Sequence, residues 1–248
     1  MFKIALQENR QQIGVWSSLC SPVCAEILGQ ANFDWILFDS EHSPTEISGL
    51  LPLLQAATGG KPHLAVRVAE NEEQLIKRAL DIGAETIFAP FIQTAADAVE
   101  LVQACRYPPA GTRGVAGAVR ANGYGRDPGY VKEANEHIGI IAQVETEEAL
   151  NKIGKIAAVE GIDGIFIGPS DLSASLGLPG QIEHPVIQQK LREAATAIRS
   201  AGKPAGILAR NAIEARQYLE WGYLFVAAGT DMGLLVKSID GLAGEMGI

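Results

Sequence analysis

Two carboxylates carry the chemistry that this sequence suggests most directly. Glu145 follows an apolar run that ends at Val144, and Asp171 follows the run Gly164-Ile165-Phe166-Ile167 after the turn Gly168-Pro169-Ser170. Carboxylates on adjacent strand ends would repel each other unless a cation lay between them. Oxygen ligands without a cysteine or histidine cluster suit Mg²⁺ or Mn²⁺. The alternative is that each carboxylate only caps the helix that follows it.

A histidine and an arginine could supply proton transfer and charge stabilisation. His42 follows Asp39-Ser40-Glu41, and histidine is a ready general base near neutral pH, although a purely structural role is the alternative. Such a base needs an orienting carboxylate, for which Asp81 is a candidate. Arg67 ends the apolar run Leu64-Ala65-Val66, where a guanidinium is costly unless it is paired. We therefore expect Arg67 either to pair with an acid or to stabilise an oxyanion.

The turn Gly168-Pro169-Ser170-Asp171 offers backbone N–H groups that could hold a substrate carboxylate. It lacks the Gly-x-x-x-x-Gly-Lys pattern of a nucleotide loop, and no Gly-x-Gly-x-x-Gly follows an early strand. No lysine lies at the end of an expected strand, which argues against an aldolase that forms a Schiff base.

The elements that must position these residues alternate regularly along the chain. Eight short apolar runs are each followed by a helical pattern, and most runs are continuously apolar, as strands covered on both faces are. This pattern predicts one α/β domain over residues 1–248, a (β/α)8 barrel, whose strand ends meet at one mouth. The expected strands cover residues 13–16, 35–38, 64–68, 86–89, 138–144, 164–167, 205–208 and 224–227, and the expected helices cover 22–30, 44–57, 72–81, 95–105, 147–158, 185–201, 213–221 and 232–246.

Composition limits the classes of partner and compartment. The chain has 248 residues, a net charge of -9 and no basic run, so we expect no nucleic acid partner. No apolar run reaches the length of a membrane helix, and the N-terminus lacks the features of a secretory signal. The odd number of cysteines indicates no disulfide framework, so we expect a cytoplasmic protein without membrane contact.

One segment interrupts the alternation. Residues 107–137 are rich in glycine and contain Arg113, Arg120 and Arg126. Long loops inside a compact domain are usually functional or disordered. Because this segment leads into the strand that carries Gln143 and Glu145, we expect an ordered loop that builds or covers the site.

Several motifs together resemble the HpcH/HpaI aldolases, which are pyruvate aldolases dependent on a divalent metal and include 4-hydroxy-2-oxoheptanedioate aldolase and 2-dehydro-3-deoxyglucarate aldolase. The resemblance covers nearly the whole chain. The motifs that carry it are Asp39-Ser40-Glu41-His42-Ser43-Pro44, Val66-Arg67-Val68, Tyr107-Pro108-Pro109-Ala110-Gly111-Thr112-Arg113-Gly114, Gln143-Val144-Glu145-Thr146 and Gly168-Pro169-Ser170-Asp171-Leu172-Ser173.

The resemblance implies a barrel of the phosphoenolpyruvate/pyruvate superfamily and a lyase that reversibly cleaves a 4-hydroxy-2-keto acid to pyruvate and an aldehyde through a pyruvate enolate held on the metal. It implies Mg²⁺, Mn²⁺ or Co²⁺ on Glu145 and Asp171, and it implies a hexamer of dimers that exchange the last helix, residues 232–246. It gives His42, Arg67 and Asp81 catalytic roles, with Asp81 paired to His42. The expected substrate-binding residues are Gln143, Gly168, Ser170, Asp171, Arg67, Trp16, Leu208 and, on the long loop, Arg120.

Two alternatives stay open at this point. The same site could act on an acyl-CoA of the malyl or citramalyl type, although the sequence has no basic cluster for the nucleotide of CoA. A barrel that only binds a keto acid would keep Asp171 and Arg67 but would have little need for a base at His42.

Overall fold

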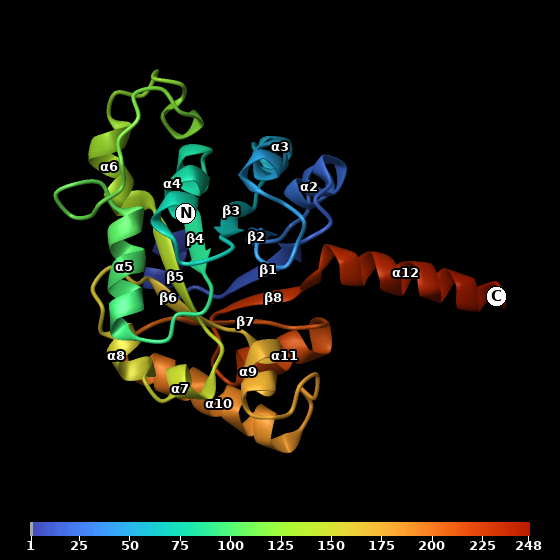
Figure 1. The fold of residues 1–248 in the computed structure, drawn as a ribbon. Helices are drawn as coiled ribbons and strands as arrows, with labels where there is room; N and C mark the ends of the chain where they lie inside the picture. The colour runs from blue at the N-terminus through green and yellow to red at the C-terminus, as the bar shows by residue number, and fades with distance from the viewer. Residues whose placement is uncertain (1) are drawn as a thin grey trace.

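The chain forms a closed barrel of parallel strands in a computed structural model, which describes residues 2–248. Each strand pairs with the next in sequence, and the last pairs with the first, so the expected (β/α)8 fold is confirmed (Figure 1). The strands are β1 (Gln12–Ser17), β2 (Trp35–Asp39), β3 (His63–Arg67), β4 (Thr86–Ala89), β5 (Gly139–Val144), β6 (Gly164–Ile167), β7 (Ala205–Leu208) and β8 (Phe225–Thr230).

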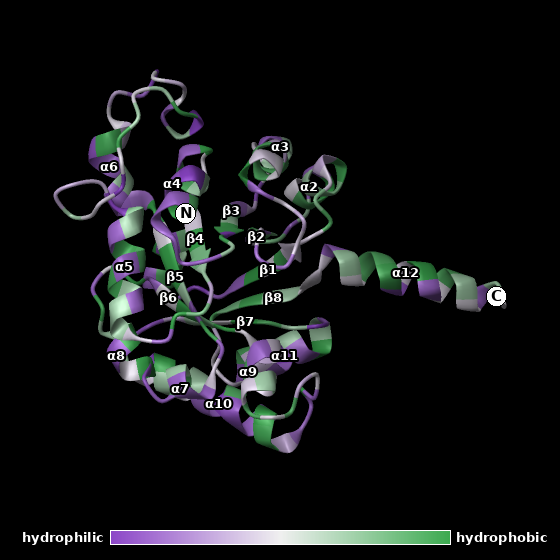
Figure 2. Cartoon of the chain, viewed as in Figure 1, coloured by the Kyte–Doolittle hydropathy of each residue, from purple (hydrophilic) through white to green (hydrophobic). Residues whose placement is uncertain are grey.

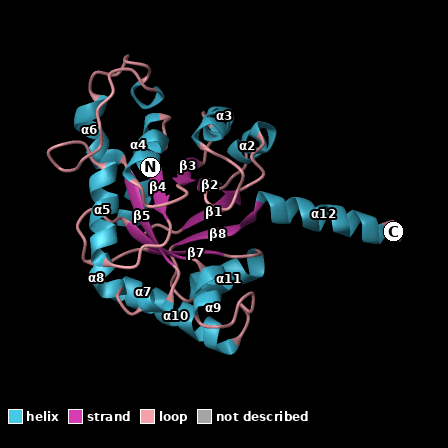
Figure 3. Cartoon of the chain, in the orientation of Figure 1, coloured by secondary structure: helices cyan, strands magenta, loops and turns pink. Residues whose placement is uncertain are grey.

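Helices surround the strands on the outside (Figure 3). Most expected helices are present within a few residues of their predicted ends, because each carries a clear cap such as Ser21, Thr94 or Asn211. The helical elements are α1 (Phe2–Gln7), α2 (Pro22–Gly29), α3 (Ile47–Ala57), α4 (Glu73–Asp81), α5 (Ala95–Cys105), η1 (Arg120–Asn122), α6 (Tyr130–His137), α7 (Glu147–Leu150), α8 (Ile153–Ala157), α9 (Pro169–Ser175), α10 (Pro185–Ser200), α11 (Ala212–Glu220) and α12 (Asp231–Glu245).

Alternate residues of the strands fill the barrel interior. Trp35, Phe88, Phe166 and Phe225 form a buried aromatic layer, and Phe2 of α1 packs against it. Glycines make room for the large rings, since a Cβ on Gly206 would collide with the ring of Phe225. The polar residues at the strand ends therefore lie above a solid apolar floor, as in other barrels of this type.

The last helix departs from the usual barrel arrangement. α12 begins beside β1 and β8 and then points away from the barrel, instead of covering the strands as the other helices do (Figure 1). Figure 2 shows that many of its residues are hydrophobic, and those from Met232 to Leu242 are exposed.

The helices of residues 2–248 were also compared with the requirements of a bilayer. None of them combines the length and the apolar character that crossing a membrane demands.

Candidate active site

A pocket of about 230 Å³ opens at the C-terminal ends of the strands. The residues that line it come from every part of the chain except its middle loop, as the barrel topology predicts. They are Trp16, Ser18, Asp39, His42, Arg67, Gln143, Phe166, Gly168, Pro169, Ser170, Asp171, Leu208 and Thr230.

Arg67 is the cation of this pocket, and two carboxylates hold it. Asp39 lies opposite Arg67 on the neighbouring strand and accepts hydrogen bonds from Nε (2.8 Å) and Nη2 (2.6 Å). Glu41 Oε2 lies 2.6 Å from Nη1, without the alignment of a hydrogen bond. The guanidinium also lies over the ring of Trp16, 4.7 Å from its centroid. Because Asp39 takes only two of the five N–H groups, Arg67 keeps donors for a ligand in a fixed orientation.

Asp39 is the firm base of this arrangement. Burial alone would raise the pKa of its carboxyl, but hydrogen bonds and charge from Arg67 outweigh burial and hold the pKa below its usual value. Trp16 Nε1 donates a further hydrogen bond of 3.3 Å to Asp39 Oδ2. Asp39 is thus the permanent anion that keeps Arg67 in place.

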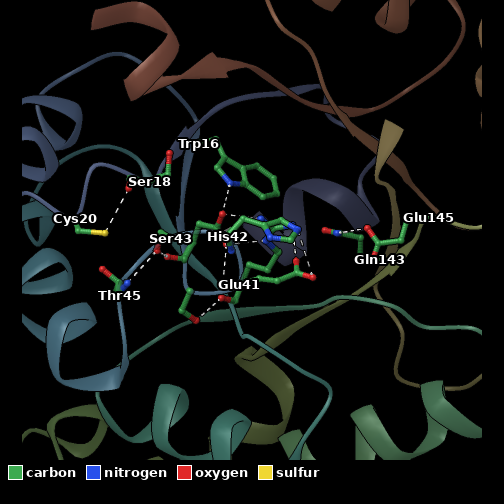
Figure 4. Close-up of polar contacts among 12 residues, drawn as sticks. Trp16, Ser18, Cys20, Glu41, His42, Ser43, Thr45, Gln143 and Glu145 are labelled. Atoms are coloured by element: carbon green, nitrogen blue, oxygen red, sulfur yellow. Dashed lines mark hydrogen bonds and ion pairs between the residues drawn. The ribbon is translucent and has the colours of Figure 1, made fainter. Parts of the chain in front are cut away.

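Glu41 connects Arg67 to His42. Its Oε1 lies 3.8 Å from His42 Nε2 (Figure 4). Burial raises the pKa of Glu41 to about 7, against the effect of Arg67 and with the support of the negative charges of Asp39 and Asp171. The His42 side chain is 63% exposed, so it lies at the mouth of the pocket, where it can exchange protons with solvent and with a ligand.

Glu145 lies on the other side of the pocket, beside Gln143 (Figure 4). Its carboxylate accepts hydrogen bonds from Phe91 N (2.7 Å) and from Gln143 Nε2 (2.6 Å). Burial raises the pKa of Glu145 to about 7, the two hydrogen bonds oppose this, and the charges of Glu41 and Asp171 reinforce it. The carboxylate lies directly behind Gly168, since a Cβ on this glycine would collide with Glu145 Oε2.

The first turn of α9 carries Ser170 and Asp171 into the pocket. Pro169 at the start of the helix fixes its direction, and Ser173 Oγ donates a 2.7 Å hydrogen bond to the carbonyl of Ser170. Asp171 therefore faces the same pocket as Arg67 and His42, next to the glycine that adjoins Glu145.

The donor atoms suit a hard divalent cation. Among residues 2–248 there is no group of three or more His, Cys, Asp or Glu side chains arranged around one point, so an ion would rest on two carboxylates. Buried Gln143 Oε1 has no hydrogen-bond partner, and Glu145 carries a raised pKa, as expected of groups that await a positive charge or a water bound to it. Oxygen donors with open positions fit Mg²⁺ or Mn²⁺ better than zinc.

The structure does not bring Asp81 to His42 within this chain. Asp81 ends α4, and the strand that follows begins at Thr86, so Asp81 lies at the N-terminal end of the barrel, opposite the pocket. There its Oδ1 accepts a 2.8 Å hydrogen bond from Arg113 Nη2. Within this chain the carboxylate that faces His42 is Glu41.

Arg120 is also at the N-terminal end of the barrel. Its Nη1 donates to the carbonyl of Ile82 (2.8 Å) and its Nη2 to Thr58 Oγ1 (2.7 Å), both at the ends of helices that lead into strands. The expectation that the long loop covers the pocket of its own chain is therefore wrong. A connection from a helix to the next strand always returns to the N-terminal end, which the loop's composition could not reveal.

The remaining predicted site residues do come together. Trp16, Arg67, His42, Gln143, Gly168, Ser170, Asp171 and Leu208 all line the pocket, and Glu145 adjoins it. Sequence reasoning did not assign roles to Ser18 and Thr230, and it gave Asp39 and Glu41 only as possible partners of Arg67. Counting alternate residues beyond Trp16 and Leu37 toward the pocket would have indicated Ser18, Asp39 and Glu41.

Comparison with known proteins agrees with this geometry. The sequence model of HpcH/HpaI aldolase/citrate lyase matches residues 12–238. The chain belongs to this family. A 5-keto-4-deoxy-D-glucarate aldolase of Citrobacter koseri is 45% identical over 98% of this chain and 94% of its own length, and one of Salmonella paratyphi A is 46% identical over the same shares.

Solved structures of the family have the same fold. An HpcH/HpaI aldolase/citrate lyase family protein from Burkholderia cenocepacia superimposes with a TM-score of 0.96 at 36% identity, covering 100% of this chain and 99% of that one. An HpcH/HpaI aldolase from Desulfitobacterium hafniense gives 0.90 at 28% identity, covering 99% and 96%. The predictions of the family, of the barrel and of an aldolase, a carbon–carbon lyase, are confirmed, and dependence on a divalent metal is general in the family.

Proposed function

We propose that this aldolase binds the pyruvyl end of a 4-hydroxy-2-keto acid between Arg67 and Asp171 and releases pyruvate and an aldehyde. The observation that carries the proposal is the fixed guanidinium of Arg67, which Asp39 and Glu41 hold in the same pocket as Asp171 and Ser170. A positive group of fixed orientation stabilises negative charge that develops during a reaction without reorganisation.

The first substrate to test is 5-keto-4-deoxy-D-glucarate, on which two relatives act by their names. Numbered from its other end, this compound is a 2-keto acid with a methylene group at C3 and hydroxyl groups at C4 and C5. Cleavage between C3 and C4 yields pyruvate and an aldehyde that carries a hydroxyl group on the carbon next to the carbonyl.

The residues divide the work between proton transfer and charge stabilisation. A divalent ion on Glu145 and Asp171 would polarise the keto group and offset the charge of the pyruvate enolate. His42 removes the proton of the C4 hydroxyl as the carbon–carbon bond breaks, and Arg67 donates hydrogen bonds to the oxygen that becomes the aldehyde. Backbone N–H groups at Ser170 and Asp171 hold the substrate carboxylate, and Trp16 and Leu208 shield the reacting carbons.

A chelation experiment tests the metal. We expect Mg²⁺, Mn²⁺ or Co²⁺ to support pyruvate release from 5-keto-4-deoxy-D-glucarate, and excess EDTA to abolish it until metal is restored. Full activity in EDTA would contradict the metal role of Glu145 and Asp171. Faster cleavage of a malyl-type thioester than of any keto acid would instead favour the acyl-CoA reaction.

We further propose that two copies of the chain exchange α12 and that three such dimers form a hexamer in the cytoplasm. The support is the projecting helix of Figure 1, whose residues Leu235, Ile239, Leu242 and Met246 are 48%, 56%, 62% and 70% exposed. Their spacing puts these four side chains on one face of the helix, as expected of a surface that packs against protein. Asp81 and Arg120, which the resemblance makes catalytic, would have to reach the pocket from another copy.

A further inference from the structure

Two hydroxyl groups line the pocket on the side away from the carboxylates. Ser18 follows β1 and Thr230 ends β8, whereas Glu145 and Asp171 follow β5 and β6. In a closed barrel of eight strands, β8 and β1 lie across the mouth from β5. A keto acid anchored at Asp171 therefore directs its other end toward Ser18 and Thr230.

A bulge places Thr230 in this wall. Gly14 pairs with Ala227 and Trp16 pairs with Thr230, so β8 has one more residue than β1 over this stretch. Bulges change the direction of the next side chain and often occur beside active sites. Here the shift sets Thr230 next to Trp16, which contacts both Asp39 and Arg67.

Asp231 fixes the position of Ser18. Its carboxylate, buried at 7% exposure, accepts hydrogen bonds from Ser18 N (2.9 Å), Leu19 N (3.2 Å) and Ser17 Oγ (2.9 Å). This clamp ties the β1 loop to the first turn of α12. The Ser18 hydroxyl is therefore held at the pocket by a rigid backbone.

The two hydroxyl groups are complementary to a third one. Ser18 Oγ donates to Asp231 Oδ1 at 3.4 Å, which leaves its lone pairs free to accept a hydrogen bond. Thr230 Oγ1 accepts from Gly233 N at 2.9 Å, and within residues 2–248 its own proton has no acceptor in the hydrogen-bond network. The pair thus offers one acceptor and one donor to a ligand.

We propose that Ser18 and Thr230 are specificity residues that recognise a hydroxyl group on the carbon next to the aldehyde carbon of the second product. The inference rests on the proposed cleavage to pyruvate, and it adds the chemical class of the aldehyde: a 2-hydroxyaldehyde. A site built to hydrogen-bond a hydroxyl discriminates against an analogue that lacks it, because its polar groups are then left without partners.

A matched pair of aldehydes tests the inference in the direction of synthesis. Glycolaldehyde and acetaldehyde differ only by this hydroxyl group, and each is offered with pyruvate and Mn²⁺. The readout is the ratio of the two kcat/KM values in wild type, Ser18→Ala, Thr230→Val and Thr230→Ser. Ser238→Ala is the control, since it removes an exposed hydroxyl group of α12 far from the pocket.

We expect Ser18→Ala and Thr230→Val each to lower the preference for glycolaldehyde by about tenfold, and Thr230→Ser and Ser238→Ala to retain it. Unchanged ratios in both Ser18→Ala and Thr230→Val would overturn the inference. Deuterium exchange of the pyruvate methyl protons by the wild-type protein, followed by NMR, separates this result from a failure of the proposed function. Without such exchange, the pyruvate reaction itself is wrong and the inference falls with it.

Discussion

At the scale of residues, the pocket is a contrast between one fixed ion pair and two carboxyls of unsettled charge. Arg67 and Asp39 stay ionised because each compensates the other, whereas Glu41 and Glu145 have pKa values raised to about 7 by burial. A site with this balance can stabilise a developing oxyanion and still attract a cation.

Removal of the arginine charge is expected to stop the reaction. We predict that Arg67→Ala lowers kcat/KM for pyruvate release by about a hundredfold or more. Arg67→Lys keeps the charge but loses the two-point contact with Asp39, so we expect it to recover only part of the loss. Pyruvate release measured with a coupled dehydrogenase checks both, with circular dichroism as the test of folding. Near-normal rates in a folded Arg67→Ala protein would exclude Arg67 from the mechanism.

The raised pKa values make metal binding depend on pH. Glu41 and Glu145 titrate near 4.5 when unfolded and near 7 when folded, so between these values the folded protein holds protons that the unfolded chain releases. Their contribution to stability is complete below the unfolded pKa and is lost as the pH rises through about 7. A divalent ion prefers the ionised carboxylates, and its effect runs the other way.

We therefore predict that Mn²⁺ raises the Tm more at about pH 8 than at about pH 5.5. Differential scanning fluorimetry with and without metal measures the difference. Glu145→Gln should abolish the increase at both pH values, and Glu70→Gln, an exposed acid outside the pocket, should not. An equal increase at both pH values would contradict the assignment.

At the scale of elements, the junction of β6 and α9 matters most, because it brings Asp171 beside Glu145. We predict that Gly168→Ala weakens Mn²⁺ binding by at least tenfold, since the added methyl would collide with Glu145 Oε2. Gly154→Ala in α8 is the matched control, because a Cβ there meets nothing within 4 Å. Isothermal titration with Mn²⁺ compares the two variants, and equal affinities would show that Glu145 does not hold the ion.

The long loop before β5 belongs to the stability of the barrel's N-terminal end. Buried Arg113 pairs with Asp81 and lies over the ring of Tyr107 at 4.3 Å. We predict that Arg113→Ala lowers the free energy of unfolding by about 3 kcal/mol. Arg126→Ala, which removes an exposed arginine of the same loop, should cost less than about 0.5 kcal/mol. Denaturant titration measures both, and equal costs would refute the structural role of Arg113.

At the scale of the whole molecule, the barrel is closed but its last helix is not part of the wall. The apolar face of α12 gains nothing from exposure to water, so a second copy is its expected partner. Because Asp231 joins this helix to the loop of Ser18, the arrangement of the subunits bears directly on one wall of the pocket.

We predict that Leu235→Glu/Ile239→Glu reduces the assembly to smaller species. Lys237→Glu is the control, since it changes the net charge by the same amount on the opposite face of the helix. Size-exclusion chromatography with light scattering determines the mass of each. Identical masses for the double variant and the control would exclude this face as the interface.

The sequence by itself determined the alternation of strands and helices, and with it the barrel and the mouth where Arg67, His42 and Asp171 meet. These features follow from local apolar periodicity and from the rule that parallel strands place their C-terminal ends together. It also carried the motifs by which the family is recognised. The positions of Asp81 and Arg120 did not follow, because loops at both ends of a barrel look alike in composition.

Only the tertiary structure decided which carboxylate faces His42, how Arg67 is shared between Asp39 and Glu41, and where the bulge of β8 sets Thr230. Such relations depend on strand register and on contacts between residues far apart in the chain. The direction of α12 is likewise decided by packing, since its sequence predicts a helix but does not say what that helix covers.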